Sequence, residues 1–142
     1  MKWHNFTRIG GVLMVQQRKL AILLIRIAAI FGLIGVFIGS MMSGQENYAY
    51  KPVHAHVTLV GWLSVFAWGI FYYVVPVSKA IIVKVQSIFG IIGAIGLTSG
   101  MYFYNFYDPT WAMIFFIVGG TVLLVAFALF VVSTFFIQQE KL

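Results

Sequence analysis

The chain has 142 residues, of which 62% are hydrophobic and only 8% are charged. A soluble domain carries about 25% charged residues, so this composition excludes an ordinary soluble protein and indicates a membrane protein. The net charge of +6 does not indicate nucleic-acid binding, because the basic residues gather at the ends of apolar segments. Cysteine is absent, which excludes disulfides, thiolate ligands and haem attached covalently through a Cys-x-x-Cys-His motif.

Four apolar segments, at about 20–42, 53–75, 80–104 and 110–137, are each long enough to cross roughly 30 Å of hydrocarbon as a helix. We therefore predict an all-α membrane protein in which residues 1–142 form a single domain with four transmembrane helices. Lysine and arginine gather in residues 1–19, around Lys79 and Lys84, and in the C-terminal tail. By the positive-inside rule, both termini are expected in the cytoplasm, in a membrane of the bacterial inner (cytoplasmic) type.

Residues 1–19 form a basic, mildly amphipathic lead-in that we expect to lie at the membrane surface. The first and third spans carry small-residue stripes that let a neighbouring backbone approach closely, and we predict that one of them mediates oligomerisation: Gly32/Gly35/Gly39 or Gly93/Gly96/Gly100. In the connectors, Ser78 and Asp108 are predicted to be the N-caps of the third and fourth helices.

Two of the three histidines, His54 and His56, open the second span, where an ionisable or metal-ligating side chain is a functional hypothesis by default. At 100° per residue, Thr58 and Gly61 lie on the face of His54, and His56 lies about 200° round. We expect His54 to face inward, beside a groove cut by Gly61 and Gly69. His56 is expected above Val60, Leu63, Ala67 and Ile70, which we expect to face lipid or to pack plainly.

The sequence does not indicate a catalytic function. The only acids, Glu46, Asp108 and Glu140, fall in loops or in the tail, so there is no buried carboxylate for proton exchange or a triad, and no catalytic residue is predicted. His54 and His56 are two residues apart on a helix, so they cannot share one metal ion.

A haem is a different case, because its iron needs one imidazole nitrogen on each face and its ring needs an apolar slot, and His54 beside glycines and aromatic residues supplies half of that. A second axial ligand would come from methionine or from His54 of a second copy across a two-fold axis; the methionines in question are Met41, Met42 and Met101. The residues alone are equally consistent with an interfacial histidine bonded to a loop carbonyl.

The stretch Lys51-Pro-Val-His54-Ala-His56-Val-Thr58-Leu-Val-Gly61-Trp62, running on to Gly69-Ile-Phe-Tyr-Tyr-Val-Val-Pro76, resembles the second membrane helix of the haem-copper oxidase catalytic subunit and its nitric oxide reductase relatives. In that family the histidine opening this helix is an axial ligand of the low-spin haem. The resemblance implies haem b with its iron on His54, and a cofactor site made of His54, Thr58, Gly61, Trp62 and His56. The four spans also resemble the opening four helices of that twelve-helix subunit.

The chain departs from the family after these four spans. It has no counterpart to the copper-ligating histidines, the high-spin haem ligand or the second low-spin ligand, so we do not expect a complete oxidase or reductase. We expect a membrane haem b protein for electron transfer or for binding haem or a small gas (NO, O2), acting as a homodimer or within a larger respiratory complex. The alternative is a haem-free structural or accessory subunit of a respiratory membrane complex.

Overall fold

The computed structural model describes the backbone of residues 3–45 and 48–138, and the side chains of residues 14–44 and 49–138. Most of this part is helical, apart from the turns at residues 75–79, 108–109 and 135–138. The elements are α1 (Trp3–Gln45), the short 3-10 turn η1 (Tyr48–Tyr50), α2 (Lys51–His56), η2 (Val57–Ser64), α3 (Val65–Val74), α4 (Ala80–Tyr107) and α5 (Thr110–Thr134). Because α2, η2 and α3 follow one another without a break, they form one rod.

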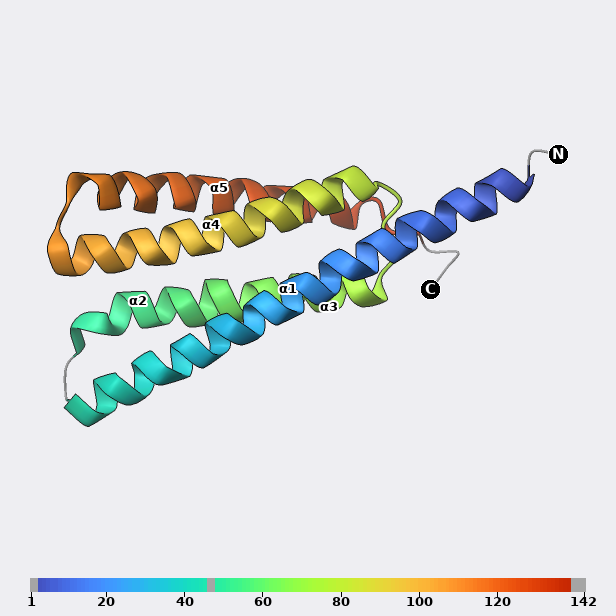
Figure 1. Cartoon of the computed structure of the whole chain (residues 1–142). Coiled ribbons are helices and arrows are strands. Elements are labelled where there is room, and N and C mark those ends of the chain that lie inside the picture. The colour runs from blue at the N-terminus through green and yellow to red at the C-terminus, as the bar shows by residue number, and fades with distance from the viewer. Residues whose placement is uncertain (1–2, 46–47, 139–142) are drawn as a thin grey trace.

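Four helical segments are long and apolar enough to cross a membrane, which confirms the predicted number of spans: Met14–Gly44, Lys51–Val74, Ala80–Tyr107 and Thr110–Thr134. The first of them differs from the prediction. α1 runs unbroken from Trp3 into the first span, and its N-terminal part projects beyond the other helices (Figure 1). Residues 12–31 contain neither glycine nor proline, so nothing in the sequence ends the helix near Leu20.

The four spans form two hairpins, α1 with the α2–η2–α3 rod and α4 with α5 (Figure 1). The backbones of α4 and α5 approach so closely that three glycine positions have no room for a side chain. A Cβ atom added to Gly93 would lie 2.7 Å from the amide nitrogen of Leu123, and Cβ atoms at Gly100 and Gly119 would also overlap the facing backbone. The glycine stripe of the third span is therefore covered by α5 of the same chain.

The hairpins pack against each other near the Pro76 turn, which we call the Pro76 end of the bundle (Figure 1). Trp68 is buried there, and its ring centroid lies 4.8 Å from that of Phe127. The buried Tyr72 hydroxyl donates a hydrogen bond of 3.1 Å to Ser133 Oγ. The turn itself is bonded to the residues after α5, with the Ser78 amide donating to the Phe136 carbonyl at 2.9 Å.

Two glutamines are buried in this half of the molecule, Gln17 with hydrogen-bond partners for its side-chain amide and Gln86 without any in the described part of the chain. The Gln17 amide donates to the carbonyls of Tyr72 and Val75, both at 2.7 Å, and its oxygen accepts from the Val77 amide at 3.1 Å. It thus satisfies backbone groups left open where Pro76 stops the helix. The side-chain amide of Gln86 on α4 is fully buried and has no hydrogen-bond partner among the described residues.

Both predicted N-caps are wrong. Lys79 precedes α4 without a side-chain cap, and Ser78 Oγ instead donates to the Phe136 carbonyl at 3.1 Å. Asp108 ends α4 rather than beginning α5, with φ 48° and ψ 38° in the left-handed region. The following Pro109 disfavours right-handed helix at Asp108, and a short polar side chain tolerates the left-handed conformation.

Candidate functional site around His54

The rod that carries both histidines changes its winding directly after them. Residues Val57–Ser64 (η2) form a π-helix, in which each amide bonds to the carbonyl five residues earlier. Ser64 Oγ follows the same spacing, donating to the Leu59 carbonyl at 2.8 Å. The wider winding keeps residues four apart near one face, so Trp62 lies with His54 and Thr58.

The face of the rod that carries His54, Thr58 and Trp62 packs onto the glycine stripe of α1. Each of its three side chains lies over one glycine, at a position where a Cβ atom would collide with it. An added Cβ would lie 2.9 Å from His54 Cε1 at Gly39, 2.6 Å from Thr58 Cγ2 at Gly35, and 3.1 Å from Trp62 Cδ1 at Gly32. The stripe predicted to mediate oligomerisation is thus covered from within the chain.

His54 faces inward, toward α1, and is half-buried. Its Nδ1 lies 3.0 Å from the Gly35 carbonyl oxygen. Since a carbonyl only accepts, Nδ1 carries the proton in this bond, and in this tautomer the lone pair of an imidazole lies on Nε2. Metal-ligating histidines commonly donate their other ring N–H to a backbone carbonyl in this way.

His56 lies on a different face of the rod. Its Nδ1 is 2.9 Å from the carbonyl of Pro52, one turn earlier in the chain, so its bond is local. Leu63 and Ile70, predicted to share its face, are 54% and 41% exposed, as lipid-facing side chains would be. His56 is therefore not brought to the His54 site.

The groove expected beside His54 is filled. The ring of Phe31 occupies the space at Gly61, where a Cβ atom would overlap it, and Ile25 Cγ1 would lie 2.8 Å from a Cβ at Gly69. The Thr58 hydroxyl donates to the His54 carbonyl at 2.8 Å, so it is bonded within its own helix.

A haem does not fit this face of the chain as it is packed. A ligand atom is available on His54, but Phe31, Thr58 and Trp62 leave no slot for a flat ring between the rod and α1. In the described part of the chain, no three histidine or acidic side chains lie together in a metal-binding group. Of the methionines predicted as second ligands, Met42 is buried on α1, while Met41 and Met101 are partly buried.

The fold and the site define an all-helical protein with four potential membrane spans, in which His54 joins two helices. A scan against protein-family models found no match, and searches of curated proteins and of solved structures found none either.

Proposed function

We propose that this chain is a haem-free structural subunit of a membrane complex, and that His54 holds the second span against the first. The observation that carries the proposal is the seating of His54, Thr58 and Trp62 on three glycines of α1. Such small-residue contacts, together with hydrogen bonds between helices, hold membrane helices together where burial from water gives no drive.

His54 contributes to this contact between the two helices in two ways. Its ring fills the space over Gly39, and its Nδ1–H donates to the Gly35 carbonyl across the helix interface. A hydrogen bond between membrane helices contributes about 0.6 kcal/mol on average. The packing of the ring adds to this, so a histidine here has a structural role without any bound metal.

The resemblance of residues 51–76 to a haem-copper oxidase helix supports a respiratory complex as the setting. Only 17% of the most apolar 18-residue stretch of α5 is buried within the chain, against 39% for α4. α5 therefore offers a surface for other subunits. In this proposal the protein lies in a bacterial-type inner membrane with both termini in the cytoplasm, as a homodimer or as part of a larger assembly.

One observation favours a second candidate function, a haem b protein for electron transfer or gas binding. Nε2 of His54 has no hydrogen-bond partner among the described residues, so its lone pair is free to bind a haem iron. Bound haem would supply a reversible one-electron couple or a gas-binding iron. The interior of the contact between the rod and α1 has no room for it.

An absorption spectrum of the detergent-purified protein, combined with histidine variants, tests both candidates. The structural proposal expects a colourless protein that co-purifies with oxidase-type subunits. It also expects His54→Ala to lower the free energy of unfolding by about 1–2 kcal/mol, through the lost hydrogen bond and the cavity left over Gly39. His56→Ala is the matched control, and its effect should stay within about 0.5 kcal/mol.

His54→Phe separates the two contributions of the ring. It retains a ring over Gly39 and loses only the hydrogen bond, so its stability should fall between those of the wild type and His54→Ala. A b-type spectrum that survives in His56→Ala and disappears in both His54 variants would overturn the structural proposal and establish the haem protein.

A further inference from the structure

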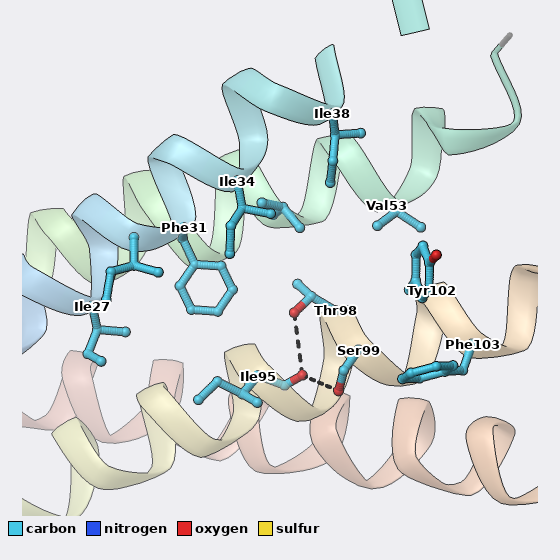
Figure 2. Close-up of a pocket in the computed structure, with 12 residues that line it drawn as sticks. Ile27, Phe31, Ile34, Ile38, Val53, Ile95, Thr98, Ser99, Tyr102 and Phe103 are labelled. Carbon is cyan, nitrogen blue, oxygen red and sulfur yellow. Dashed lines mark hydrogen bonds between the residues drawn. The ribbon is translucent and has the colours of Figure 1, made fainter. Parts of the chain in front are cut away.

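A cavity of about 460 Å³ lies between α1, the start of the second span and α4. Figure 2 shows Ile27, Phe31 and Ile34 reaching into it from α1 and Ile95 from α4, with Val53 at one end. All of these residues belong to segments long and apolar enough to span a membrane, so the cavity lies at the depth of the hydrocarbon.

The hydroxyl groups in its wall are bonded to their own helix. Thr98 Oγ1 donates to the Ala94 carbonyl at 2.7 Å. Figure 2 shows the bond from Ser99 Oγ to the Ile95 carbonyl, at 2.6 Å, and a longer one from Thr98 Oγ1 to the same carbonyl, at 3.4 Å. Tyr102 stands at the end of the cavity near Val53, beside the connector rather than in the middle of the wall (Figure 2). A buried water needs two to four polar partners. The middle of this cavity offers none, so its occupant must be apolar.

The cavity opens sideways, toward the bilayer. Four of its lining residues are also exposed on the surface of the bundle: Ile30 at 56%, Ile34 at 44%, Ile95 at 49% and Phe103 at 39%. The mouth thus lies between α1 and α4, where the surroundings of a membrane protein are lipid chains.

The cavity has the length of one leaflet. On α1 its wall extends from Ile27 to Ile38, and the eleven steps of 1.5 Å between these residues span about 16 Å. Half of the hydrocarbon thickness is about 15 Å. Val53 marks the end nearest the connector, two residues after Lys51, which lies at the level expected for lipid headgroups.

We propose that this cavity binds the acyl chain of a membrane phospholipid as a resident ligand that fills the gap between the two hairpins. The chain enters between α1 and α4, lies along α1 between Ile27 and Ile38, and leaves its headgroup beside the connector before α2. A quinone is the poorer occupant, because its carbonyl groups would need hydrogen-bond donors and the hydroxyls in the middle of the wall, on Thr98 and Ser99, are already engaged.

Photo-crosslinking tests this proposal on the full chain in lipid nanodiscs. The probe is a phosphatidylcholine with a diazirine in the middle of one acyl chain, and mass spectrometry locates the labelled residues. We expect labelling to concentrate on the cavity wall, and Ile95→Trp, which fills the cavity from α4, to lower that labelling by roughly tenfold. Ile88→Trp is the matched control, since Ile88 lies two turns earlier on the same helix, is 40% exposed and does not line the cavity.

A second filling variant, Ile34→Trp, approaches from α1, so the test holds even if one substitution prevents folding. The contrary result is labelling spread evenly over exposed residues such as Leu124 of α5, with no loss in either filling variant. That result would show that the labelled lipid is ordinary surrounding bilayer and would overturn the proposal. Displacement of the probe by excess long-chain prenyl quinone, but not by excess unlabelled phosphatidylcholine, would overturn the choice of an acyl chain.

Discussion

Two adjacent glycines of α5 should respond very differently to the same substitution. Gly119 faces α4, and a Cβ atom there would overlap the amide nitrogen of Leu97 and the backbone of Gly96. Backbone atoms cannot rotate out of the way, so α4 and α5 must separate to accept the methyl group. At Gly120 the nearest atom is Leu97 Cδ1, at 3.4 Å, which is the end of a flexible side chain.

The size of the difference follows from this geometry. Overpacking a close contact costs about 1–3 kcal/mol. Replacing a helical glycine with alanine returns at most about 1 kcal/mol in water, and less in a bilayer, where separated spans remain helical. We therefore expect Gly119→Ala to lower the free energy of unfolding by about 1–3 kcal/mol, and Gly120→Ala to change it by less than about 0.5 kcal/mol.

Unfolding by sodium dodecyl sulfate in mixed micelles, followed by tryptophan fluorescence, measures both variants under the same conditions. The wild type and the Gly120→Ala variant should have matching transitions, and the Gly119→Ala transition should come at a lower detergent fraction. Equal stabilities for the two variants, or a larger loss at Gly120, would refute the close backbone contact between α4 and α5.

The two buried glutamines should respond with opposite signs in the same unfolding assay. Gln17→Leu leaves three backbone groups unbonded and should destabilise the protein by about 1–3 kcal/mol, whereas Gln86→Met removes an unpaired amide and should leave stability unchanged or raise it by about 1 kcal/mol; a loss in Gln86→Met would reveal a partner for that amide. For the topology, Ser43→Cys and Ser78→Cys, both at exposed positions of this cysteine-free chain, should react with an impermeant thiol reagent from opposite sides of the membrane. Reaction of both from the same side would contradict the four-span arrangement.

The spans were predictable because each depends only on local hydropathy, and the inward orientation of His54 followed from the helical period of its neighbours. The N-terminal boundary of the first span was not predictable, since residues 12–19 differ from the span in charge but contain neither glycine nor proline to end a helix before Leu20. The π-helix was also missed, because its winding depends on how the rod packs against α1. Periodicity places Gly61 on the same face as His54, but it does not reveal that Phe31 of another helix fills the space there.

The hydrogen bonds of Gln17 bear on how the protein is made. Its side chain serves backbone groups 55 to 60 residues later in the chain, at the end of the second span. During synthesis, α1 is complete long before those groups emerge, and until the two helices meet, the carbonyls of Tyr72 and Val75 lack the partner that Gln17 provides. Leaving buried backbone groups unbonded is costly. The hydrogen bonds at the Pro76 end of the second span are therefore complete only when α1 lies beside it, so this end of the span forms together with α1.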